Sequence, residues 1–223
     1  MRIVDLTKET AENILENMLK RSPTQYGTYE AAVNEIVTAV REKKDAAVFS
    51  YTEKFDGAKL DASSVEVTEE EVEEAYRQVD EGLIDVIRKA RANILAYHEK
   101  QKENSWFTST EEGTLLGQKV TPLNRVGVYV PGGKAAYPSS VLMNVLPAQV
   151  AGVREICMVT PCNREGKVNP VVLAAAKEAG VQRIFKIGGA QAVAALAYGT
   201  ESIPKVDKIV GPGNIYVALA KKA

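Results

Sequence analysis

The sequence predicts an α/β fold: an incomplete Rossmann-like parallel sheet of βαβ units, preceded by a mainly helical N-terminal region. After residue 106, four short apolar segments begin 25 to 30 residues apart, and a helical pattern follows each one. That alternation is typical of right-handed βαβ crossovers. Before residue 106, apolar residues recur three and four positions apart, the period of amphipathic helices, and only three of the 16 glycines occur there. We therefore expect a helical region over 1–105 and an α/β domain over 106–223.

The N-terminal region is predicted to contain five helices and one short strand. Apolar spacing predicts helices over 9–20, 29–43, 46–54, 69–79 and 81–102, and a strand over 64–67. Thr68 and Glu71 have the spacing of a capping box, in which each side chain satisfies a backbone N–H group of the other. The acidic residues around Glu71 are interpreted as a solvated first helical turn, which the helix dipole favours, rather than as a cation site.

The second region begins with a predicted β-hairpin over 106–121, with a turn at Glu111–Gly113. The parallel strands are then expected at Arg125–Val130, Glu155–Thr160, Arg183–Ile187 and Lys208–Val210. Helices are expected near 139–151, near 169–179, over Ala190–Tyr198 and from Asn214 onward. Pro147 predicts a kink or an early break in the first of these helices, because proline lacks the backbone N–H donor. The last helix reaches Ala223 without a capping signal, so we expect the sequence to be part of a longer chain.

Composition places the chain among globular proteins. Its 223 residues are 45% apolar and 26% charged, and no apolar run is long enough to span a membrane. The N-terminus lacks the apolar core of a secretory signal, and the two cysteines are expected to be reduced, so we expect a cytoplasmic protein. A single histidine makes a zinc site of several His and Cys ligands impossible within this chain.

Charge is unevenly distributed although the formal net charge is only -1. Residues 1–106 hold 15 Lys and Arg against 22 Asp and Glu, whereas residues 107–223 hold 13 against 7. That excess is too small to predict nucleic-acid binding, but it favours a small anionic ligand. Alternatively, the two oppositely charged parts simply face each other.

Three glycine-rich loops follow predicted strands: Pro131-Gly132-Gly133-Lys134, Gly188-Gly189-Ala190-Gln191 and Gly211-Pro212-Gly213-Asn214. Ligands of open parallel sheets bind at such loops, where glycine lets backbone amides approach closely and the next helix directs free N–H groups at an anion. A diphosphate would fit. None of the loops is a standard dinucleotide fingerprint or a P-loop, and short strand-to-helix turns need glycine for geometric reasons as well.

Polar side chains in these loops suggest what the ligand is. Tyr129 offers a flat ring with a hydroxyl at its tip, suited to a base or a nicotinamide. Gln191 lies in the first turn of its helix, and Asn214 occupies a predicted N-cap. The alternatives are that Tyr129 is a core residue and that Asn214 only caps its helix, as Ser139 and Ser140 would cap theirs.

Other reactive side chains do not form a predicted catalytic set. His98 lies on the apolar stripe of a helix with no Cys or second His nearby, so we interpret it as a packed, hydrogen-bonded core residue. A Ser-His-Asp triad is not supported. Cys157 lies in an apolar strand and is expected to be buried and inert. Cys162 lies in a loop after Pro161, without a basic neighbour to argue for its activation.

Long sequence blocks resemble the histidinol dehydrogenase family. They are VGVYVPGG (126–133), GGAQA (188–192), YGTESIPKVDKI (198–209), GPGN (211–214), DG (56–57) and YHEKQ (97–101). Their order and spacing also match, and the similarity extends over essentially the whole sequence.

The resemblance implies a zinc-dependent enzyme of histidine biosynthesis, working as an intertwined homodimer. Such an enzyme uses two NAD molecules in succession to oxidise L-histidinol, through an aldehyde, to L-histidine. By resemblance, Tyr129, Gln191 and Asn214 occupy NAD-contacting positions, and Ser139 lies near the substrate pocket.

The family's zinc ligands and its proton-handling Glu-His pair belong to a later half that has no counterpart in this sequence. We therefore interpret the sequence as the NAD-side portion, inactive by itself, with no catalytic or metal-binding residue of its own. Two alternatives stay open: a non-catalytic nucleotide-binding or assembly module of the same fold, and an unrelated phosphate-binding α/β protein.

Overall fold

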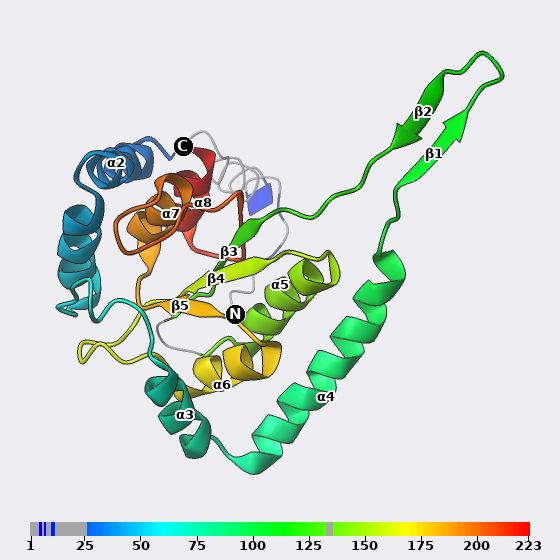
Figure 1. Cartoon of the computed structure of the whole chain (residues 1–223). Coiled ribbons are helices and arrows are strands. Elements are labelled where there is room, and N and C mark those ends of the chain that lie inside the picture. The colour runs from blue at the N-terminus through cyan, green and yellow to red at the C-terminus, as the bar shows by residue number, and fades with distance from the viewer. Residues whose placement is uncertain (1–4, 6, 8–9, 12–25, 133–135) are drawn as a thin grey trace.

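The computed structural model describes residues 5, 7, 10–11, 26–132 and 136–223. A four-stranded sheet lies at its centre with helices on both sides, and a two-stranded hairpin extends away from this body (Figure 1). Most of the helix predicted over 9–20 lies outside the described residues. In the described part of the chain, no helix has both the length and the apolar character needed to cross a bilayer.

The central sheet is entirely parallel, as predicted. Its strands are β3 (Arg125–Tyr129), β4 (Glu155–Val159), β5 (Arg183–Phe185) and β6 (Lys208–Val210), in the spatial order β5-β4-β3-β6. The chain therefore proceeds outward from β3 to β5 and then crosses back to place β6 on the other side of β3. This reversal creates a switch point between β3 and β6, the place where open parallel sheets bind ligands.

Helices from the N-terminal region cover both faces of this sheet. On one face, α2 (Gly27–Asp56) packs with α7 (Gly189–Tyr198) and α8 (Ile215–Lys222). On the other face, α3 (Glu69–Gln78) and α4 (Glu81–His98) pack with α5 (Pro138–Val150) and α6 (Pro170–Ala179). The N-terminal helices thus share both hydrophobic cores of the α/β part.

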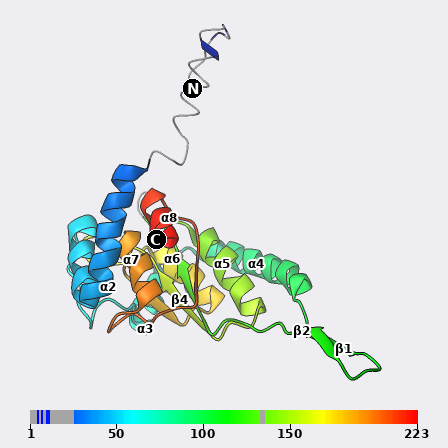
Figure 2. The same ribbon diagram turned by 90° about the horizontal axis from the view of Figure 1, so that it is seen from above.

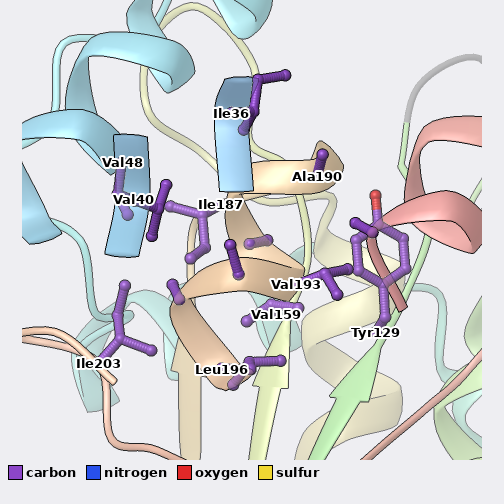
Figure 3. Close-up of a cluster of buried hydrophobic side chains, with 14 of the residues drawn as sticks. Ile36, Val40, Val48, Tyr129, Val159, Ile187, Ala190, Val193, Leu196 and Ile203 are labelled. Atoms are coloured by element: carbon purple, nitrogen blue, oxygen red, sulfur yellow. The ribbon is translucent and has the colours of Figure 1, made fainter. Parts of the chain in front are cut away.

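Close packing of α7 on the sheet explains one glycine in β3. A Cβ atom at Gly127 would lie 2.8 Å from the Leu196 Cδ1 atom, too close for two carbon atoms. Leu196, Val193 and Val159 belong to the cluster that α7 forms with α2 and the sheet (Figure 3). Glycine at 127 therefore lets α7 pack closely against the sheet.

The helices predicted over 29–43 and 46–54 are the two halves of α2, joined by a sharp bend at Lys44 (φ 51°, ψ -129°). Lys44 Nζ donates to the carbonyl of Gly199 over 3.0 Å, and Ser202 Oγ donates to the Asp45 carboxylate over 2.6 Å. The bend is thereby anchored to the loop after α7, and both halves of α2 line the same cavity.

The capping box and the hairpin are both confirmed. Glu71 N donates to Thr68 Oγ1 over 3.2 Å, and Thr68 N donates to Glu71 Oε2 over 2.9 Å. The hairpin pairs β1 (Trp106–Ser109) with β2 (Leu115–Gln118), and every residue of both strands is exposed. The hairpin projects beyond the end of α4, clear of the sheet (Figure 2).

Four local predictions need correction. The strand predicted over 64–67 is reduced to a single antiparallel bridge between Glu66 and Phe185, because only one short stretch runs beside the edge strand β5. The helix predicted over 81–102 ends at His98 and is followed by a 3₁₀ turn, η2 (Glu99–Gln101). Pro147 does not end its helix early, since the helix continues to Val150, and the alternative of a kink stays a prediction. Neither Ser139 nor Ser140 is the N-cap of that helix, because it begins at Pro138, whose fixed φ suits a first helical position.

His98 is not a core residue. It lies half-buried at the end of α4, with Nδ1 2.7 Å from Gln101 Oε1 and its ring edge-on to Tyr97. The expected hydrogen bond is therefore present, but the side chain faces the helix end instead of the apolar interior.

Candidate functional site

A cavity of about 1050 Å³ opens at the carboxyl edge of the sheet, at the switch point between β3 and β6. Its walls come from the loops that follow β3, β4, β5 and β6, from both halves of α2 and from the first turn of α5. The volume is at the upper end of the range for sites that enclose small molecules and cofactors. The three glycine-rich loops that were predicted to form a binding site therefore all line this one cavity.

Tyr129 is the last residue of β3 and lines this cavity. Its side chain is 4% exposed and packs at the margin of the apolar cluster, with the hydroxyl at its outer end (Figure 3). The hydroxyl accepts a hydrogen bond from the Gly189 N–H group over 3.0 Å, and burial raises the pKa of Tyr129. The neutral phenol thus holds the first turn of α7 in place beside the cavity.

Gln191 places a buried side-chain amide on the cavity wall. The residue is 1% exposed and lines the cavity, yet neither Oε1 nor Nε2 has a hydrogen-bond partner in the described part of the chain. Leaving a buried donor or acceptor unsatisfied costs about 1–3 kcal/mol. A ligand that presents both a donor and an acceptor would satisfy the amide. The carboxamide of a nicotinamide and the edge of an adenine are two such groups.

Glycine at position 189 makes this placement of Gln191 possible. A Cβ atom there would lie 2.6 Å from Gln191 Oε1, and the backbone has a φ of +65°. Any larger residue would be strained in this conformation and would displace the amide.

Asn214 caps α8, which was one of the two roles considered for it, the other being contact with a ligand. Its Oδ1 atom accepts a hydrogen bond from Val217 N over 3.2 Å, and the residue also lines the cavity. Because capping uses only the side-chain oxygen, the Nδ2 group can still donate to a ligand. The N-termini of α7 and α8 thus both border the cavity, and their dipoles favour a negatively charged group such as a diphosphate.

The wall contributed by α2 was missed by sequence reasoning. Tyr51 and Phe55 stack with ring centroids 5.7 Å apart and planes 12° apart, and Lys54 Nζ lies within 6 Å of both rings. Asp56 follows them and also lines the cavity. Two aromatic rings one helical turn apart, just before the Asp56-Gly57 turn, were the signal that could have revealed this wall.

Comparison with known proteins identifies the family. The family model described as histidinol dehydrogenase matches residues 19–223. The histidinol dehydrogenase of Geobacillus kaustophilus is 57% identical over 213 residues, covering 95% of this chain and 50% of the relative. That of Aquifex aeolicus is 57% identical over 224 residues, covering 100% and 51%. The chain belongs to the histidinol dehydrogenase family.

A solved structure agrees with the sequence matches. The histidinol dehydrogenase of Elizabethkingia anophelis superposes with a TM-score of 0.81 at 40% identity, over 86% of this chain and 44% of that one. The chain spans about half the length of the curated histidinol dehydrogenases it matches.

Of the four residues singled out from the resemblance to histidinol dehydrogenases, three line one cavity: Tyr129, Gln191 and Asn214. Ser139 is exposed on the first turn of α5, and the neighbouring Ser140 lines the cavity instead. Successive residues on a helix point in directions about 100° apart, so a one-residue difference decides which serine faces the ligand. A substrate-binding role for Ser139 stays a prediction.

The described residues do not offer a zinc site. No three His, Cys, Asp or Glu side chains among them come together as metal ligands. Both cysteines are buried, and burial is the main cause that raises the pKa of Cys157 to about 12 and that of Cys162 to about 11. Lys186 lies near Cys162 in space, although not in sequence, but its charge is outweighed by burial and by Asp56. The residues that the structure describes therefore do not fit a zinc ion.

Proposed function

We propose that this chain is the NAD-binding side of a zinc- and NAD-dependent histidinol dehydrogenase, an oxidoreductase of histidine biosynthesis. The proposed overall reaction oxidises L-histidinol to histidinal and then to L-histidine, with one NAD accepting a hydride in each step. The observation that carries the proposal is the buried amide of Gln191, which has no partner among the described residues and lies beside the N-termini of α7 and α8 in a cavity of dinucleotide size.

Each residue has a distinct part in holding the cofactor. The Gln191 amide would donate to and accept from the dinucleotide, and Asn214 Nδ2 would donate to it. Tyr129 would act by fixing Gly189. NAD supplies the hydride acceptor when it is bound. The groups that would move protons and hold zinc are expected in the half of histidinol dehydrogenases that has no counterpart in this chain.

Family membership also supports three further proposals: L-histidinol as the substrate, a homodimer as the assembled enzyme and a cytoplasmic location. The near-neutral charge gives no support for a nucleic-acid partner.

Titration of NAD into the 223-residue chain tests the proposal. We expect saturable binding that is weakened in Tyr129→Phe by roughly 3- to 10-fold, since a net hydrogen bond is worth about 1 kcal/mol. Tyr129→Ala should weaken binding further, with thermal unfolding measured in parallel because the ring is buried. Tyr97→Phe, on exposed α4 surface, is the matched control.

Absence of NAD binding by the unmodified chain would contradict the proposal and favour an assembly module. Equal effects of the Tyr129 and Tyr97 substitutions would contradict the assigned site.

The same chain is expected to show no oxidation of L-histidinol, even with NAD and added zinc, because the described residues offer no metal-ligand cluster. Formation of NADH can be followed by its absorbance. Turnover above the rate of a chain-free control would show that the catalytic groups lie in this half after all.

A further inference from the structure

Asp56 is a carboxylate in the cavity whose role nothing above explains. It is the last residue of α2, and its side chain lines the cavity together with those of Tyr51 and Phe55. Its Oδ2 atom is buried and has no hydrogen-bond partner among the residues described. An ionised carboxylate accepts several hydrogen bonds when satisfied, so one bare buried oxygen indicates a donor that is missing from the chain itself.

The electrostatic surroundings place this carboxylate among the other cavity groups. Asp56 contributes to raising the pKa of both Tyr129 and Cys162, which lie on β3 and after β4. Burial raises the pKa of Asp56 itself, the direction expected for a carboxyl without a compensating partner. The one basic side chain on the described cavity wall, Lys54, lies over the rings of Tyr51 and Phe55.

The sheet lacks a carboxylate where this type of fold ordinarily has one. In dinucleotide-binding parallel sheets, an acidic residue near the end of the second strand accepts hydrogen bonds from the ribose hydroxyls. The second strand here is β4, and Thr160, Pro161, Cys162 and Asn163 follow it without an acidic residue. Pro161 and Cys162 nevertheless reach the cavity, on the same walls as Asp56.

We propose that Asp56 takes this role from outside the sheet, accepting hydrogen bonds from the adenosine ribose hydroxyls and selecting NAD over NADP. The 2′-phosphate of NADP would place negative charge against the carboxylate and would remove the donor that satisfies it. The exposed ring of Phe55, one residue earlier, provides a flat apolar surface for the adenine attached to that ribose. This inference rests on the proposed NAD-binding function and names the selectivity of the same site.

Paired titrations with NAD and NADP test the inference in three proteins: the unmodified chain, Asp56→Asn and Glu53→Gln. Glu53 is the matched control because it lies on the same last turn of α2 but pairs with Lys59 over 3.5 Å, away from the cavity. The unmodified chain is expected to prefer NAD by at least 10-fold. Asp56→Asn should lose about 10-fold in NAD affinity, since a hydrogen bond to a charged group is worth about 1.5–3 kcal/mol, and its preference should fall below about 3-fold. Glu53→Gln should keep the original preference.

A second ligand makes the test independent of how well the variant folds. NAD that lacks the adenosine 2′-hydroxyl should bind the unmodified chain about 10-fold more weakly than NAD, and should bind Asp56→Asn no more weakly than NAD does. An unchanged NAD to NADP ratio in Asp56→Asn, or equal binding of NAD and its 2′-deoxy form by the unmodified chain, would overturn the inference alone. Failure of the unmodified chain to bind either dinucleotide would overturn the proposed function with it.

Discussion

The two faces of the sheet satisfy their polar side chains in different ways. On the face covered by α3 to α6, Arg183 donates twice to Glu66, each over 2.8 Å, and Lys186 Nζ lies 2.5 Å from Glu71 Oε1, although Arg91 Nε on α4 has no partner among the residues described. On the face covered by α2, α7 and α8, Gln191 and Asp56 line a cavity with polar atoms that have no partner among the described residues.

The difference separates groups that hold the fold together from groups that await a ligand. Unsatisfied buried groups lower the stability of the free protein, so they persist only where the surrounding packing compensates. Here the compensation comes from α7, in which four of the five alanines pack against the sheet and α2 with 2% exposure or less: Ala190, Ala192, Ala194 and Ala195. We interpret the cavity side as the functional face for this reason.

The alkylation rates of the two cysteine thiols are expected to show that side chains are well buried on both faces of the sheet. Cys157 belongs to the cluster with α7 and Cys162 to the cluster with α5 and α6. With pKa values of about 12 and about 11, both are almost fully protonated at pH 8, so alkylation of the native chain should be at least 100-fold slower than in urea. Because the thiols ionise more readily in the unfolded chain, stability should also fall as the pH rises above about 8.5.

Mass spectrometry after timed alkylation measures this directly. Cys157→Ser isolates the signal of Cys162. Fast modification of Cys162 in the folded variant would show that the loop after β4, where Cys162 lines the cavity, is open to the reagent and less well packed than described.

Truncating a buried side chain on the face covered by α3 to α6 should lower the free energy of unfolding without changing NAD binding. Leu146 is fully buried on α5, and Leu146→Ala should lower the free energy of unfolding by about 2–5 kcal/mol, because it removes packed methyl groups and leaves a cavity. Leu116→Ala, on the exposed hairpin, should change it by less than about 0.5 kcal/mol. Urea unfolding gives both values. A loss of NAD affinity in folded Leu146→Ala would contradict the assignment of stability to one face and ligand binding to the other.

Two glutamines offer the most closely matched test of that separation. Gln191→Leu removes an unpaired amide, so it should weaken NAD binding about 10-fold or more while leaving stability unchanged or slightly higher. Gln149 Nε2 on α5 donates to the Ala179 carbonyl over 2.5 Å, so Gln149→Leu should lower stability by about 1 kcal/mol and leave NAD binding unchanged. Calorimetry and urea unfolding of both variants are needed. The opposite assignment of the two effects would refute the distinction between paired and unpaired groups.

Sequence periodicity predicted the sheet accurately because its short strands are apolar and each is ended by glycine or proline. The four strands, the hairpin and the Thr68 capping box were predicted from such local signals. The bridge at Glu66 and the continuous helix through Pro147 were not, since both depend on which neighbour packs alongside.

The site was only partly predictable for the same reason. Tyr129, Gln191 and Asn214 follow strands of one sheet, so topology alone brings them to one edge. Asp56 and Phe55 reach that edge only because α2 bends at Lys44 and folds over the sheet, which is a tertiary arrangement. His98 is a residue whose position was predicted wrongly. Its place on an apolar stripe predicted a core residue, but the structure has it at the end of α4.

The side-chain amide resonances of Gln191, assigned by their loss in Gln191→Leu, provide the most direct measurement on a ¹⁵N-labelled chain titrated with NAD. If the unpaired amide awaits the dinucleotide, both resonances will shift in a saturable manner as NAD is added. Resonances that stay fixed while NAD binds would contradict the account, because the ligand would then leave the buried amide as unsatisfied as it was before.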